Sequence, residues 1–123
     1  MDADRVRRAT LHGLDAPESR QLCRLDGEPW RCGQDATNAL AGMIASRAVA
    51  CQELDRDRHG RKVAKCSVAG ADLGEWMVAN GWAVAYVYFS YEYSRAEQRA
   101  KSAQQGIWAG EFEMPWEWRK GNR

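Results

Sequence analysis

The segment of residues 48–70, "AVACQELDRDRHGRKVAKCSVAG", constrains the fold of this chain more than any other. It reads as a strand, a turn at Arg58-His59-Gly60 and a second strand. Cys51 and Cys66 lie nearly symmetrically about that turn. In a hairpin folded there, the two cysteines would face each other across the strands, within reach of a disulfide.

The other two cysteines, Cys23 and Cys32, flank the stretch "RLDGEPWR". Neither spacing matches the usual CxxC zinc patterns, so the sequence does not favour metal ligation by cysteine. We predict the disulfides Cys23–Cys32 and Cys51–Cys66; the alternative is four buried thiols in a cytosolic protein. Disulfides indicate an oxidising compartment, so we expect a secreted or periplasmic protein. The first ten residues have no apolar core, so we expect no signal peptide in this chain, as in a mature protein.

The length of 123 residues suits one domain with one core, so we expect residues 1–123 to form a single domain. No run of about 18 apolar residues exists, so we expect no membrane span and no membrane partner. The formal net charge is +1, which neither indicates nor excludes a nucleic-acid partner.

The remaining segments predict an α+β domain with three helices. Asp72 is expected to cap the second helix, and Ser94 with Glu97 is expected to form a capping box on the third. Gly81 and Gly106 are expected to end these two helices. The expected elements are a strand over 5–14, a loop over 19–33, helices over 34–47, 71–82 and 94–108, and an extended segment over 83–89.

An acidic stretch, "LHGLDAPESRQ" at residues 11–21, places Asp15, Pro17 and Glu18 within four positions, directly after a short apolar segment. Two interpretations are open: a plain turn with two solvated acids, or a site for a metal ion and a water molecule. Taken alone, the stretch favours the plain turn.

Four motifs follow one another in an order that resembles the thermonuclease family, the staphylococcal-nuclease-like domains. They are "GLDAPE" (13–18), "DRHGR" (57–61), "GWAVAYVY" (81–88) and "AEQRAKSAQQGIW" (96–108). The resemblance covers roughly residues 2–110. It implies an OB-fold-like five-stranded barrel with three helices. It also implies a calcium-dependent phosphodiesterase that cleaves DNA and RNA with little sequence specificity and leaves 3′-phosphate ends.

The resemblance also implies roles for individual residues. The carboxylate of Asp15 and the backbone carbonyl of Ala16 would bind calcium, which takes oxygen ligands. Asp4, in the "DADR" stretch, would add a carboxylate to the same ion. Glu18 would orient or deprotonate the attacking water. Arg61 would hold the transition-state phosphate, since a guanidinium grips two oxygens at once.

Three further residues are implied to contact nucleic acid. Tyr86 and Tyr88 alternate along an extended segment, where they would meet the phosphate and base of a bound nucleotide. Ordinary packing is the alternative for both tyrosines. His59 stands where the family often has tyrosine, and it either faces the substrate or is idle.

The start of the chain departs from the family pattern. The family's first strand is absent, so the expected barrel has shortened N-terminal strands and an open edge. Thr10 occupies the register of a catalytic arginine, and Arg8, two residues earlier, is the candidate replacement. A truncated or rearranged start, a homodimer through the open edge, and a bulge that shifts Arg7 and Arg8 are the explanations left open.

The sequence thus predicts a nuclease whose partners are single-stranded or double-stranded DNA and RNA, with activity impaired by Thr10 and the shortened start. The alternative is a catalytically weakened or inactive nucleic-acid-binding module on the same fold. A purely structural protein is disfavoured, because a scaffold does not require Asp15 and Glu18 beside Arg61. Metal-dependent cleavage would separate the first two hypotheses.

Overall fold

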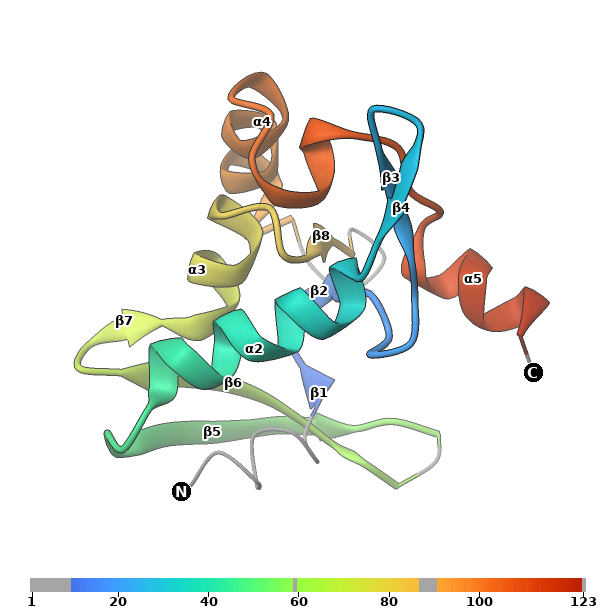
Figure 1. Cartoon of the computed structure of the whole chain (residues 1–123). Helices are drawn as coiled ribbons and strands as arrows, with labels where there is room; N and C mark the ends of the chain where they lie inside the picture. The colour runs from blue at the N-terminus through green and yellow to red at the C-terminus, as the bar shows by residue number, and fades with distance from the viewer. Residues whose placement is uncertain (1–9, 59, 87–90, 123) are drawn as a thin grey trace.

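The predicted hairpin is the longest piece of sheet in the computed structural model, which describes residues 10–58, 60–86 and 91–122. Strands β5 (Val49–Arg56) and β6 (Lys62–Val68) pair antiparallel with Cys51 opposite Cys66, and the register shifts once between Glu53 and Asp55. In Figure 1 the hairpin forms the lower layer of the molecule. The strand, turn and strand expected from the sequence are confirmed.

Six further short strands complete the sheets of the described residues. On β6, β1 (Thr10–Leu11) pairs parallel and β7 (Ala71–Asp72) pairs antiparallel. Two separate pairs are β2 (Leu14–Asp15) with β8 (Val84–Ala85), and β3 (Cys23–Leu25) with β4 (Glu28–Trp30).

Among the described residues these sheets do not close into a barrel, so the expected five-stranded barrel is not seen as such. Part of the difference lies in the strand predicted over 5–14, which is interrupted in the structure. Within its described part, a turn at His12-Gly13 separates β1 from β2, and Gly13 has a φ of 83°, a conformation that suits glycine and ends an extended strand. Residues 1–9 lie outside the described part of the chain.

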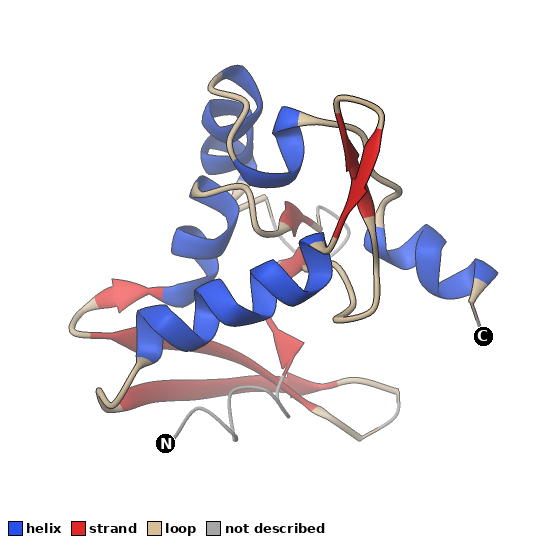
Figure 2. Ribbon diagram, in the orientation of Figure 1, coloured by secondary structure: helices blue, strands red, loops and turns tan. Residues whose placement is uncertain are grey.

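Four α-helices are described, one more than the sequence predicted (Figure 2). They are α2 (Cys32–Ile44), α3 (Leu73–Ala79), α4 (Ser94–Ser102) and α5 (Pro115–Gly121), with a 3₁₀ turn η1 (Gly106–Ala109) after α4. The unpredicted helix, α5, begins with Pro115, whose fixed φ suits the first turn of a helix. None of the helices in the described ranges has the length and apolar character needed to cross a bilayer.

The predicted helix caps had different outcomes. Asp72 does cap α3, because its side chain accepts a hydrogen bond from the Gly74 N–H at 3.2 Å. The capping box at Ser94 is wrong, since Tyr93 takes the cap position of α4. The Glu97 carboxylate instead accepts from the Ala85 N–H at 2.9 Å, which ties α4 to β8.

Three apolar clusters fill the interior. The first lies between α2 and the sheet of β5 and β6 (Figure 1), and includes Ile44, Val68 and Leu73. The second joins β2, β8, α3 and α4 around Leu14 and Val78. The third surrounds the Cys23–Cys32 disulfide and contains the fully buried Ile107. Because Leu14 belongs to the second cluster, the core fixes the backbone directly before Asp15.

Both predicted disulfides are present, with Cα–Cα distances of 5.6 Å for Cys23–Cys32 and 4.1 Å for Cys51–Cys66. The first lies beside a hairpin that was expected to be a loop. Asp26 and Gly27 form its turn with φ values of 53° and 81°. An Asp-Gly pair is a strong signal for such a turn, and it was present in the sequence.

Replacing Cys51 and Cys66 together by serine should lower the free energy of unfolding by about 3 kcal/mol, because the disulfide closes a loop of sequence separation 15 in the unfolded chain. Urea denaturation measures the change. Urea denaturation of both proteins in a reducing buffer is the control, because the difference should vanish there. A double variant as stable as the oxidised wild type would contradict the prediction.

Tyr93 joins α3 to the start of α4. Tyr93 is 2% exposed, and its hydroxyl donates to the Asp72 carboxylate at 2.6 Å. Burial, followed by this hydrogen bond, raises the pKa of the Tyr93 hydroxyl far above its ordinary value. The hydroxyl therefore stays protonated as a donor.

Changing Tyr93→Phe should cost about 1–2 kcal/mol of stability, because the buried Asp72–Tyr93 hydrogen bond is lost. Tyr91→Phe is the matched control, since Tyr91 is 79% exposed and its loss of a hydroxyl should be nearly neutral. Thermal unfolding compares the two. Equal stability of both variants would show that the hydrogen bond contributes nothing.

Candidate functional site

Asp15 and Glu18 lie where strand β2 ends. Asp15 is the last residue of β2 and pairs with Val84 of β8, and the preceding pair, Leu14 with Ala85, belongs to the second cluster. The buried Pro17 follows, and Glu18 lies in the turn beyond it. A strand held by the core and a rigid turn thus present the two carboxylates side by side.

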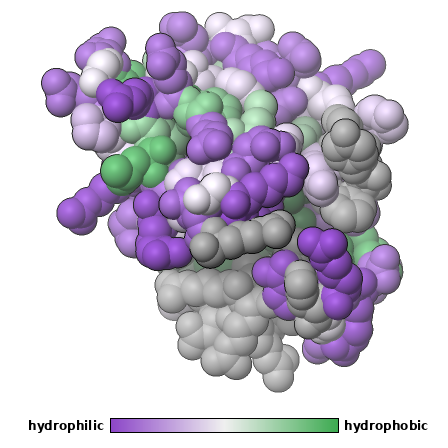
Figure 3. Space-filling model, turned by 90° about the vertical axis from the view of Figure 1, so that its right-hand side faces the viewer, coloured by the Kyte–Doolittle hydropathy of each residue, from purple (hydrophilic) through white to green (hydrophobic). Residues whose placement is uncertain are grey.

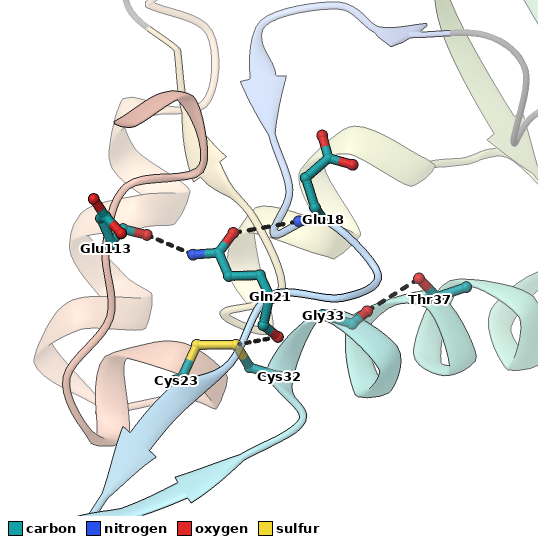
Figure 4. The surroundings of a disulfide bond; sticks show 7 residues. All are labelled: Glu18, Gln21, Cys23, Cys32, Gly33, Thr37 and Glu113. Atoms are coloured by element: carbon teal, nitrogen blue, oxygen red, sulfur yellow. Dashed lines mark hydrogen bonds between the residues drawn. A yellow bond between two sulfur atoms is a disulfide. The ribbon is translucent and has the colours of Figure 1, made fainter. Parts of the chain in front are cut away.

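Gln21 fixes the backbone of the turn at residues 18–21, here called the acidic turn (Figure 4). Its side chain is fully buried; it accepts from the Glu18 N–H at 3.3 Å and donates to the Glu113 carbonyl at 2.7 Å. The Gln21 N–H also donates to the Glu18 carbonyl at 2.8 Å. A buried amide with these partners is expensive to disturb, so it holds Glu18 in place. Sequence reasoning did not single out Gln21, since a polar residue in an expected loop carries no signal of burial.

The first turn of α2 packs directly against the acidic turn. The Gly33 N–H donates to the Gln21 carbonyl at 3.1 Å. A Cβ at position 33 would lie only 1.7 Å from the Glu18 carbonyl oxygen, so only glycine fits here. The Sγ of Cys32 lies 3.6 Å from the Gln21 carbonyl, and since disulfide sulfur has no proton, this is a packing contact.

Arg119 of α5 contacts both carboxylates. Its Nη1 donates to Asp15 Oδ1 and to Glu18 Oε1, each at 3.0 Å, and its Nη2 pairs with Asp15 Oδ2. A bidentate guanidinium–carboxylate pair is among the stronger polar contacts in proteins. Sequence reasoning missed Arg119, because nothing in the basic tail marks which of its cations turns inward.

Burial outweighs this pairing in its effect on the pKa of Asp15. Desolvation raises the pKa of the Asp15 carboxyl above its ordinary value, although the Arg119 contacts act in the opposite direction. The same hydrogen bonds raise the pKa of Arg119, chiefly through Asp15. One guanidinium therefore does not fully compensate the cost of a buried carboxylate, and a cation of higher charge would favour its ionised form more strongly.

Arg61 is held in the β5–β6 turn. Its Nε donates to Asp57 Oδ2 at 2.6 Å, and its backbone N–H donates to Asp57 Oδ1 at 2.8 Å. Asp57 thus braces this turn through both of its carboxylate oxygens. The Arg61 side chain is 60% exposed and forms its ion pair with Asp57. The structure therefore does not join it to Asp15 and Glu18, the acidic pair.

The other predicted residues divide into described and undescribed ones. Ala16 is half-buried, and its backbone hydrogen bond to Asp15 helps to stabilise that carboxylate. Tyr86 is half-buried, and its ring lies 5.0 Å from the Trp116 ring of α5 at an angle of 30°. Asp4, Arg8, His59 and Tyr88 lie outside the described residues.

The chemistry of the donor set fits a hard cation. Asp15 and Glu18 offer carboxylate oxygens, and calcium takes oxygen ligands from carboxylates, carbonyls and water. Within residues 10–58, 60–86 and 91–122, no group of three or more potential metal-ligating His, Cys, Asp or Glu side chains gathers. The described part of the chain therefore supplies two carboxylates, and fewer charged ligands generally mean a weaker calcium site.

Comparison with known proteins now places the chain in a class. The sequence model of the family described as "Staphylococcal nuclease homologue" matches residues 8–110. The chain belongs to this family. The acidic turn, the β5–β6 hairpin and helices α2 to α4 all lie within the match, whereas α5 with Arg119 lies beyond it.

Individual relatives carry different names. The chain is 40% identical over 111 residues to the "Succinoglycan biosynthesis protein ExoI" of Rhizobium meliloti (strain 1021), covering 86% of this chain and 58% of that protein. It is 33% identical over 119 residues to the "Probable staphylococcal-like nuclease CAN3" of Oryza sativa subsp. japonica, covering 94% and 29%. It is 32% identical over 124 residues to the "Probable endonuclease LCL3" of Schizophyllum commune, covering 86% and 41%. The chain thus spans less than two thirds of the length of each of these relatives.

Changing Gly33→Ala should destabilise the protein by about 1–3 kcal/mol, because the new methyl group must push the Glu18 carbonyl aside. Gly42→Ala in the same helix is the matched control. A Cβ there meets nothing within 4 Å, so this change should stabilise the protein by about 0.5–1 kcal/mol. Urea denaturation of the two variants should give changes of opposite sign, and the same sign would contradict the packing described here.

Proposed function

We propose that this chain is a calcium-dependent nuclease that hydrolyses phosphodiester bonds in DNA and RNA with little sequence specificity and leaves 3′-phosphate ends. The juxtaposition of Asp15 and Glu18 at the end of β2 carries the proposal. The family match and the names of the rice and fungal relatives support the nuclease class.

The proposed reaction assigns one task to each residue. Asp15 and the Ala16 carbonyl would hold the calcium ion, with Asp4 as a further carboxylate. The ion would supply positive charge to a phosphate oxygen and to water. Glu18 takes a proton from the attacking water, whose oxygen forms a bond to phosphorus. The bond to the 5′ oxygen breaks, and that oxygen receives a proton.

Positive charge near the phosphate would come from Arg61, with Arg8 as a further candidate. A preorganised cation stabilises the charge that develops on the phosphate oxygens in the transition state. The bond between Asp57 and Arg61 would limit the positions that the guanidinium can take. Tyr86 and Tyr88, with His59 in the turn, would contact the nucleotide, since aromatic rings stack on any base.

A nucleic-acid-binding module with weak or no turnover is the second candidate. Two observations favour it: Thr10 stands at the register of an arginine, and Arg119 engages both carboxylates of the acidic pair. Under this proposal the protein would retain binding to nucleic acid while cleavage is slow or absent.

The setting of the protein is also a proposal. Two disulfides support a secreted or periplasmic protein, because reducing compartments keep thiols free.

A homodimer through a sheet edge is proposed as one way to complete the sheets. Light scattering across a range of protein concentrations would test it, and a constant monomer mass would refute it.

Changing Glu18→Gln should reduce cleavage of single-stranded DNA in millimolar calcium by at least about a hundredfold, since the amide cannot accept the proton of water. Binding of the same DNA should change little. Glu28→Gln is the matched control, because Glu28 is exposed on β4. This variant should cleave DNA like the wild type. Addition of a chelator should stop cleavage by the wild type. A folded wild type that binds DNA but never cleaves it would favour the binding module instead.

A further inference from the structure

The acidic pair already has a cationic occupant, and it comes from the C-terminal helix. Both carboxylate oxygens of Asp15 and one of Glu18 contact the guanidinium of Arg119. A calcium ion bound by Asp15 would need the same oxygens. Two cations that compete for one set of carboxylate oxygens repel each other at short range, and partial burial of Asp15 strengthens this repulsion.

Helix α5 is built so that its end can release the pair while its start stays packed. Pro115 is buried at the first position, and Trp116 packs against Tyr86. Arg119 lies one turn later, near the C-terminal end of the helix, and its side chain is 41% exposed. The guanidinium can therefore turn into solvent by side-chain rotation, without unpacking the two anchoring residues.

The surroundings of α5 are accessible to ions. Figure 3 shows the side of the molecule that carries α5 in Figure 1, and its described surface is mostly hydrophilic. Glu18 is itself 43% exposed in its side chain. An ion from solvent can thus approach the pair, and a displaced guanidinium regains water.

We propose that Arg119 is an exchangeable counter-ion of the acidic pair, and that α5 thereby sets the affinity of this pair for divalent cations. The inference rests on the proposed function, in that Asp15 is taken as a calcium ligand. Calcium binding displaces the guanidinium from Asp15, and the intact Arg119 contact lowers the affinity for calcium. By linkage, calcium must weaken the Arg119 contact by the same factor by which Arg119 weakens calcium binding.

Calcium binding to the full chain, measured by calorimetry with calcium chloride in low-salt buffer, tests the proposal without any cleavage assay. Arg119→Gln removes the charge but keeps a polar, uncharged side chain. We expect this variant to bind calcium at least about fivefold more tightly than the wild type, the lower end of typical coupling between sites. Thermal unfolding of each variant checks that it is folded.

Lys120→Gln is the matched control, because it removes the same charge one residue further along α5. Lys120 is 62% exposed in its side chain and pairs with Glu117, not with the acidic pair. Its calcium affinity should stay within about twofold of the wild type, since an exposed charge is screened by solvent. Equal tightening in both variants would mean a general charge effect and would overturn the proposal.

A second measurement uses the wild type alone. The side-chain Nε–H signal of Arg119 in an NMR spectrum, assigned by its loss in Arg119→Gln or Arg119→Lys, should shift as calcium is added. An unshifted signal at saturating calcium would overturn the exchange. It would do so even if the glutamine variant failed to fold.

The outcomes separate this proposal from the proposed function. If the wild type binds calcium and Arg119→Gln binds it equally or more weakly, the counter-ion role is wrong and calcium dependence stands. Weaker binding would indicate that Arg119 supports the site. If the folded wild type binds no calcium at millimolar concentration, both the counter-ion role and the calcium site are wrong.

Discussion

The approach of helix α2 to the acidic turn is the contact on which the candidate site depends. The backbone of Gly33 lies so near the Glu18 carbonyl that a side chain cannot fit between them. Gln21 completes this contact, since its buried amide joins the turn to the Glu113 carbonyl near α5. The carboxylates are therefore positioned by backbone packing and a buried amide, which are less mobile than surface side chains. Thus the first turn of one helix and the approach to another determine where Glu18 lies.

The charges of the site follow from that placement. Packing holds Asp15 where desolvation raises its pKa, and Arg119 compensates only part of the cost. Such a carboxylate gains more from a divalent cation than an exposed one would, because charge interactions strengthen as water is excluded. The same arrangement explains why the structure shows a guanidinium on the pair. A half-buried pair of acids without any cation nearby would be costly to fold.

Much of the fold was predictable where one local signal dominates. The hairpin, both disulfides and the Asp72 cap follow from turn residues, from cysteine spacing and from a short-range side-chain preference. The failures have two different causes, a distant partner in one case and an overlooked local signal in the other. Glu97 bonds to Ala85 of β8 instead of capping its own helix, and the Asp26-Gly27 turn was overlooked although its signal was local.

The residues of the candidate site were likewise predictable only where they lie close together in the sequence. The motif places Asp15 and Glu18 within four positions, so their proximity could be expected from the chain itself. Arg119 is about a hundred residues away, and no periodicity or spacing connects it to the acidic turn. Its role depends on where the tail folds back, which a motif that ends before α5 cannot indicate.

The origin of the cation at the site shows why α5, the helix beyond the family match, matters. Resemblance predicts an arginine at the register of Thr10, yet the cation that contacts the acids comes from α5. A guanidinium delivered from a terminal helix differs physically from one on a central strand, because its position depends on the packing of Pro115 and Trp116. A loosely anchored cation is poorly preorganised for transition-state stabilisation but well suited to exchange with an ion. The chemistry of the acidic pair would then depend on the anchoring of α5 as much as on the two carboxylates themselves.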